Sequence, residues 1–222
     1  MAKKIGVILS GCGVYDGSEI HESVITLLAI DRAGAEAVCM APNIDQMHVI
    51  NHLVGEPAEG ESRNVLVESA RIARGDIKDI ANVKAEDFDA LILPGGFGAA
   101  KNLCDFAVNG PDCNVNPEVA RVVRETVTAG KPLAAVCIAP ALLAKVLGPV
   151  NSPALTIGTD AETAEALNTM GARHVACPVR ETVVDEKNKI ISSPAYMLAG
   201  SISEAADGIE KTVRQLIAMI DG

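Results

Sequence analysis

Short apolar runs alternate along the chain with segments whose apolar positions recur every three or four residues. A short apolar run that ends at Gly or Pro is typical of a strand buried on both faces of a sheet. We expect such strands over residues 5–13, 36–42, 89–96, 132–137, 154–160, 174–185 and 189–195. The longer periodic segments predict helices over residues 22–35, 116–131, 140–148 and 202–220. This alternation predicts an α/β fold with a mostly parallel sheet and helices on both faces.

Residues 43–88 are the least regular part of the chain. We expect a helix there plus an excursion from the sheet, with an exposed loop over residues 56–64. The sequence has no internal repeat, low-complexity tract or obvious linker. A single domain over residues 1–222 is therefore expected, and 222 residues are enough to bury a substantial core.

Composition narrows the classes of partner. The 19 basic residues are outnumbered by 29 acidic ones, which gives a net charge of −10. Nucleic acid is an unsuitable partner because no basic stripe is present. The negative net charge also disfavours docking on anionic membrane surfaces. The apolar stretch near the N-terminus is expected to be too short for a membrane span or a signal peptide.

The six cysteines are scattered and form no CxxC pair, which disfavours both a disulfide framework and a zinc site. We therefore expect a reducing, cytoplasmic location. His48 and His52 have the i, i+4 spacing of a zinc-binding helix, but Val49 stands where HExxH needs Glu. A solvated helix face is the preferred interpretation of this pair, and no metal or cofactor is expected.

One cysteine lies at a position suited to chemistry. The stretch "KPLAAVCIAP" (131–140) places Cys137 between a strand and a helix, with Ala135 and Ala139 as small neighbours. A nucleophile elbow requires such small residues because the turn is tight and strained. The following helix would direct its N-terminal dipole at the sulfur, which favours a lowered thiol pKa. The competing interpretation is an inert core thiol, and Cys12, in the first glycine loop, is the main rival nucleophile.

Two further loops are expected beside this elbow, because ligands bind at the carboxyl ends of parallel strands. In "LPGGFGAAKN" (93–102), Gly95 and Gly96 let the backbone approach a ligand, and with the N–H of Ile138 they could form an oxyanion hole. The loop "SGCGVYDGSEIHES" (10–23) brings Glu19 and Glu22 near the cysteine, where burial would raise a carboxyl pKa. The residues alone do not decide between these two glutamates.

These loops, together with "LTIGTD" (155–160) and "SPAYMLA" (193–199), resemble the class I glutamine amidotransferase-like superfamily in its PfpI-type branch, over nearly the whole chain. The likeness is strongest to bacterial glyoxalases linked to isoprenoid biosynthesis. It implies a flavodoxin-like three-layer α/β/α sandwich, Cys137 as nucleophile, Glu22 as its carboxylate partner and a homodimer. It also implies conversion of glyoxal to glycolate without glutathione, cofactor or metal.

Two departures from the family pattern refine this hypothesis. Ser193, Pro194 and Ala195 stand where glutamine amidotransferases carry a His-x-Glu pair, so glutamine hydrolysis is not expected. Ile138 stands where many PfpI-type proteins carry His, which disfavours proteolysis. A Cys–Glu pair alone suits a small electrophilic aldehyde better than a resistant amide. The alternatives are a regulatory or redox-sensing protein, or a protein deglycase, on the same fold.

Overall fold

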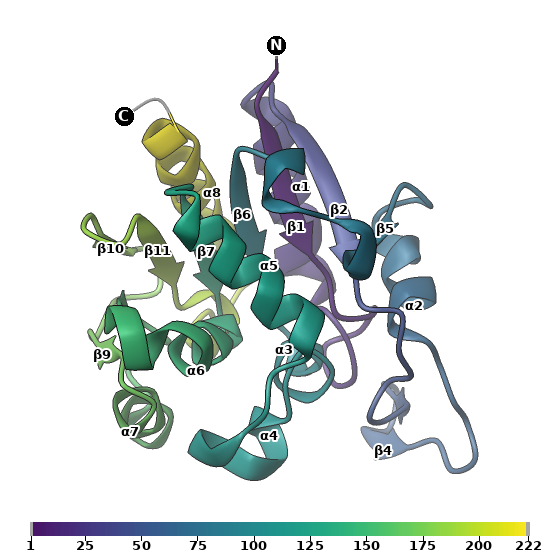
Figure 1. Ribbon diagram of the computed structural model, residues 1–222. Helices are drawn as coiled ribbons and strands as arrows, with labels where there is room; N and C mark the ends of the chain where they lie inside the picture. Colours follow the sequence, from purple (N-terminus) through teal and green to yellow (C-terminus); the bar gives the residue numbers. More distant parts are fainter. Residues whose placement is uncertain (1, 221–222) are drawn as a thin grey trace.

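The computed structural model describes residues 2–220 and consists of a central sheet between two layers of helices (Figure 1). Seven strands form the sheet in the order β10-β11-β7-β6-β1-β2-β5. Every neighbouring pair is parallel except β10 and β11. The expected flavodoxin-like α/β/α sandwich is therefore confirmed.

The strands of this sheet are β1 (Lys4–Ile8), β2 (Glu36–Ala41), β5 (Lys78–Asp79), β6 (Ala90–Leu93), β7 (Leu133–Val136), β10 (Val183–Asp185) and β11 (Ile190–Ser193). Two small sheets pair β3 (Ile50–Asn51) with β4 (Glu56–Pro57) and β8 (Ala154–Leu155) with β9 (Arg173–His174). The α-helices are α1 (Ile20–Arg32), α2 (Val65–Ile72), α3 (Phe97–Lys101), α4 (Phe106–Asn109), α5 (Pro117–Thr128), α6 (Ala139–Asn151), α7 (Ala161–Thr169) and α8 (Ile202–Ile220).

The central strands are apolar at almost every position because each covers two hydrophobic cores. In β6, Leu91 and Leu93 pack in the core beneath α5 and α6, whereas Ala90 and Ile92 pack in the core beneath α1 and α8. Successive side chains of a strand point to opposite faces, which produces this division. Such strands end together at the carboxyl edge of the sheet, where the loops after β1, β6 and β7 meet.

The predicted strands over residues 154–160 and 174–185 are only partly correct. β8 ends at Leu155, and Gly158 has a φ of 100° that interrupts an extended strand. Between β9 and β10 the chain makes a turn, in which the N–H of Glu181 donates to the carbonyl of Pro178 at 3.0 Å. The sequence pattern also missed α7, which is capped by Asp160 and has Leu167 as its buried residue. One buried position is too few for a clear helical period.

In the irregular region, the expected helix is α2, and the chain from 43 to 64 makes the excursion. Residues 56–64 are largely exposed, as expected. No helix within residues 2–220 combines the length and the apolarity that crossing a membrane would need.

Candidate active site

Cys137 lies in a strained turn at the carboxyl end of β7. Its φ of 61° is in the left-handed region, which costs a residue with a β-carbon roughly 1–2 kcal/mol. Its own N–H donates to the carbonyl of Ser193 at 3.0 Å, which holds the turn against β11. Only 8% of Cys137 is exposed, and α6 begins at Ala139. The predicted strand–elbow–helix geometry is present.

Glu22 is completely buried and interacts with three parts of the chain. Its Oε2 accepts the N–H of Gly95 at 2.9 Å, and its Oε1 accepts the N–H of Tyr196 at 3.1 Å. The carboxyl also hydrogen-bonds the thiol of Cys137. Glu19 has a different position, because its Oε2 caps α1 by accepting the N–H of Glu22 at 2.7 Å. The structure therefore places Glu22, as the family resemblance implies, beside Cys137.

Burial dominates the electrostatics of this pair. Removal from water raises the pKa of Glu22 to about 7, against the opposing effect of its backbone donors. The pKa of the Cys137 thiol is also raised, first by burial and then by the Glu22 carboxylate, and the N–H groups of Gly96 and Ile138 offset this only in part. The expectation of a lowered thiol pKa is therefore wrong, because burial outweighs the helix terminus. Above about pH 7 the pair therefore keeps one proton, which stays on the Cys137 thiol and is hydrogen-bonded to the Glu22 carboxylate.

The glycine turn after β6 supplies two different contacts. The N–H of Gly96 and the N–H of Ile138 both point at the sulfur of Cys137. An oxygen bonded to a carbon attacked by that sulfur would therefore lie near both donors. Gly95 departs from its expected role in an oxyanion hole, because its N–H donates to Glu22. It holds the carboxylate in place instead.

Replacing Gly95 with alanine is expected to disrupt this arrangement. A β-carbon at position 95 would lie 2.4 Å from the Cys137 β-carbon and 2.7 Å from Glu22 Oε2, so one of them must move. We expect turnover to fall by about 10²-fold, since small displacements of reacting groups have effects of this size, and stability to fall by about 1–3 kcal/mol. Kinetics and urea unfolding measure the two effects. Gly200→Ala is the matched control, because its β-carbon would meet nothing closer than 3.6 Å; equal losses in both variants would contradict the prediction.

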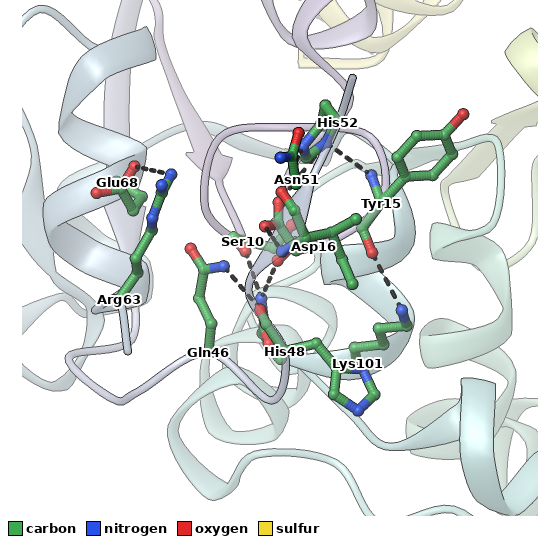
Figure 2. A network of polar contacts seen from close by, with 12 residues as sticks. Ser10, Tyr15, Asp16, Gln46, His48, Asn51, His52, Arg63, Glu68 and Lys101 are labelled. Atoms are coloured by element: carbon green, nitrogen blue, oxygen red, sulfur yellow. Dashed lines mark hydrogen bonds and ion pairs between the residues drawn. The ribbon is translucent and has the colours of Figure 1, made fainter. Parts of the chain in front are cut away.

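The loop after β1 is held by side chains from distant segments. Asn102 donates from one amide nitrogen to the carbonyls of Ser10 and Asp16, both at 2.8 Å. Figure 2 shows His52 against the backbone of Tyr15 and beside Asp16, with Lys101 reaching the Tyr15 carbonyl from the other side. These contacts fix the loop that leads into Glu19 and α1.

A cavity of about 530 Å³ opens over Cys137. Its lining is mostly apolar and comes from the loops after β1 and β6, from α3, α4, α7 and the Cys137 elbow, and from the turn after β11. The lining residues are Val14, Glu19, Gly96, Phe97, Ala100, Phe106, Ala107, Cys137, Ile138, Asp160, Thr163, Tyr196 and Met197. The two charged side chains among them, Glu19 and Asp160, are acidic. A neutral ligand fits this cavity better than an anionic one.

The histidines lie differently from the sequence-based expectation. His48 and His52 are on a loop and beside β3 rather than on a helix, so the solvated helix face is wrong. Among residues 2–220, no group of three or more His, Cys, Asp or Glu side chains is placed to hold a metal ion. His21 Nδ1 lies 2.8 Å from the hydroxyl of Tyr196, a cavity residue that sequence reasoning did not single out. The sequence signal for Tyr196 is its place within the segment "SPAYMLA" (193–199).

Comparisons with known proteins agree with the fold and identify related proteins. The model of the DJ-1/PfpI family matches residues 13–199. A crystal structure of an isoprenoid biosynthesis protein with an amidotransferase-like domain from Ehrlichia chaffeensis has a TM-score of 0.92 and 40% identity, covering 98% of this chain and 99% of that one. Glyoxalase III from Candida albicans shares the fold, with a TM-score of 0.64 and 15% identity over 98% of this chain and 97% of that one.

Two named relatives correct the expected location. The human glutamine amidotransferase-like class 1 domain-containing protein 3, mitochondrial, is 51% identical over 98% of this chain and 84% of its own length. The zebrafish (Danio rerio) ES1 protein, mitochondrial, is 37% identical over 87% of this chain and 76% of its own length. The cytoplasmic expectation is contradicted by these mitochondrial relatives. It rested on cysteine usage, which reports a reducing environment and does not identify a compartment.

Proposed function

Because the chain belongs to the DJ-1/PfpI family, we propose that it is a cofactor-independent glyoxalase that converts glyoxal to glycolate. One observation carries this proposal: a buried thiol is hydrogen-bonded to a buried carboxyl beneath a mostly apolar cavity, and two backbone N–H groups point at the sulfur. Glyoxal is a neutral dialdehyde and needs no cofactor to become electrophilic. The cavity also has room for larger 2-oxoaldehydes.

The reaction begins when the Cys137 sulfur attacks one aldehyde carbon while its proton passes to Glu22. The carbonyl oxygen of that carbon is stabilised by the N–H groups of Gly96 and Ile138, and Glu22 then returns the proton to it. The product is a neutral hemithioacetal. Glu22 next moves a proton from the sulfur-bearing carbon to the second carbon, and the hydroxyl proton on the first carbon passes to the oxygen of the second, which yields a thioester of glycolate. Water hydrolyses this thioester and releases Cys137, so glyoxal and one water become glycolic acid.

The redox-sensing alternative is less well supported, because the thiolate is the form that reacts with oxidants and the Cys137 pKa is raised. Glutamine hydrolysis is disfavoured because the chain has Ser193, Pro194 and Ala195 in place of the His-x-Glu pair. A link to isoprenoid biosynthesis is suggested by the name of the Ehrlichia relative. The homodimer stays a prediction.

Steady-state kinetics on purified protein, with glycolate quantified as product, test the proposal. We expect saturable glyoxal consumption with stoichiometric glycolate. Glyoxylate tests the cavity charge as an inhibitor, because its second carbon is a carboxylate that cannot be isomerised to a net product and that the acidic side chains of Glu19 and Asp160 would repel. We expect its inhibition constant against glyoxal to exceed the KM for glyoxal by at least about 10-fold. Failure to form glycolate would refute the proposed function, and inhibition by glyoxylate at or below the KM for glyoxal would refute the role of cavity charge.

A further inference from the structure

Tyr196 lies in the cavity wall and is built into the same site as Cys137 and Glu22. Its ring packs against the small cluster that contains Cys137, and its N–H donates to Glu22 Oε1 at 3.1 Å. Ala195, directly before it, is fully buried and has a φ of 43°. This left-handed conformation is costly for alanine and persists only where the surroundings enforce it. The strained backbone therefore orients Tyr196 from a fixed position.

The Tyr196 hydroxyl is held by a histidine from another element. His21 follows the cap of α1 and immediately precedes Glu22, and adjacent helical residues point about 100° apart. Because Glu22 points at Cys137, His21 lies on a different side of α1, and its Nδ1 lies 2.8 Å from the Tyr196 oxygen. The side chain of His21 is 49% exposed, and Glu19 Oε1 lies 3.9 Å from the same nitrogen. The ring centroids of His21 and Tyr196 lie 5.8 Å apart.

We propose that Tyr196 is a further catalytic residue, which carries a proton between the two substrate oxygens while Glu22 carries one between the two carbons, and that His21 positions its hydroxyl. This inference rests on the proposed glyoxalase function. The proposal requires the His21 tautomer with the proton on Nδ1, which donates to the Tyr196 oxygen and leaves the phenol O–H for the substrate. The role requires an aromatic hydroxyl at the cavity wall, and Tyr196 is the tyrosine that lines the cavity together with Cys137.

The proton and electron movements balance without an external reagent. The Glu22 carboxylate removes the hydrogen of the sulfur-bearing carbon as a proton, and the electron pair of that bond forms a carbon–carbon double bond. The electron pair of the second carbonyl moves onto its oxygen, which takes the phenol proton of Tyr196. Glu22 then protonates the second carbon, and the hydroxyl proton of the first carbon returns to the Tyr196 oxygen. The products are the thioester, the phenol and the carboxylate.

The electrostatics of the site suit a proton donor. Burial raises the pKa of Tyr196, and the negative charges of Glu19 and Glu22 raise it further, so the phenol holds its proton at neutral pH. Donation by His21 stabilises the phenolate that forms during the transfer. A buried tyrosine usually finds a partner for its hydroxyl, but a merely structural tyrosine would not need to line the cavity above a nucleophile.

The test compares the two tyrosines of the chain. Tyr196→Phe keeps the ring and removes the hydroxyl, and we expect kcat for glyoxal to fall by about 10²-fold with little change in KM. Tyr15→Phe is the matched control, because Tyr15 also lies against a histidine ring, that of His52 with ring centroids 5.0 Å apart, but is outside the cavity lining. We expect this control to retain full activity.

Variants of His21 test the positioning role. His21→Ala should lower kcat by about 10-fold, and His21→Asn, whose amide nitrogen can occupy the place of Nδ1, should recover part of that loss. A structural role for His21 alone would not predict recovery by an amide donor. Full kcat in Tyr196→Phe, with active wild type, would overturn this proposal alone. Wild type that consumes no glyoxal would overturn the proposed function and this inference together.

Discussion

Replacing Cys137 with alanine is expected to abolish glyoxal consumption, with kcat/KM falling on the order of 10³-fold or more. The sulfur forms the bond that every later step requires, and Glu22 alone offers no covalent intermediate. Other cysteines cannot substitute for it. Cys39, Cys104, Cys113 and Cys177 are buried, and none of them lines the cavity above the elbow.

The control for this loss is Cys12→Ala. Cys12 is partly exposed and lies in the loop after β1, but it does not line the cavity, so its removal should leave turnover unchanged. Glycolate formation by metal-free protein measures both variants. Substantial turnover by Cys137→Ala, or loss of turnover in Cys12→Ala alone, would contradict the assignment of the nucleophile.

The backbone strain in the turn at Cys137 can also be tested through protein stability. Alanine retains the β-carbon that is strained at a φ of 61°, whereas glycine does not. We therefore expect the free energy of unfolding of Cys137→Gly to exceed that of Cys137→Ala by about 1 kcal/mol. The glycine variant should accordingly unfold at a higher urea concentration. Such a result would indicate that the elbow holds strain in order to present the sulfur. The reverse order would show that the turn is relaxed.

The parts of the site that were predictable from sequence are those encoded within short segments. The elbow at Cys137 follows from a strand, two small neighbours and a helix start within ten residues. The contacts of Glu22 could not be read in this way, because they join α1, the turn after β6 and the turn after β11. The partnership of His21 with Tyr196 spans 175 positions along the chain. The direction of the Cys137 pKa shift could not be predicted from the sequence, because the burial of the thiol depends on the whole fold.

Replacing Glu22 with glutamine is expected to remove both the proton carrier and a pH dependence of stability. In wild type, kcat/KM should rise as the pH passes through about 7, because the ionised carboxylate is the form that accepts the thiol proton. In Glu22→Gln this rise should disappear and kcat/KM should be lower by at least about 10²-fold. Glu59→Gln, in the exposed loop, should leave the rate unchanged.

The sign of the stability effect follows from the raised pKa. The carboxyl titrates near 4.5 when unfolded and near 7 when folded, so between these values the folded state binds more protons. Wild-type stability contributed by Glu22 is therefore fully present below pH 4.5 and declines as the pH rises to about 7, by about 3 kcal/mol in total.

The glutamine variant separates this pH effect from a constant one. Glutamine places an amide NH2 group where Glu22 has its second oxygen, so either the Gly95 or the Tyr196 N–H loses its acceptor, and the resulting cost to the variant of about 1–3 kcal/mol does not itself change with pH. Urea unfolding from pH 4.5 to 8 measures the difference between wild type and variant at each pH. We expect wild type to be the more stable near pH 4.5 and to lose most or all of that advantage by pH 8. A difference that is constant with pH would show that Glu22 does not titrate in this window, and another group would then have to accept the thiol proton.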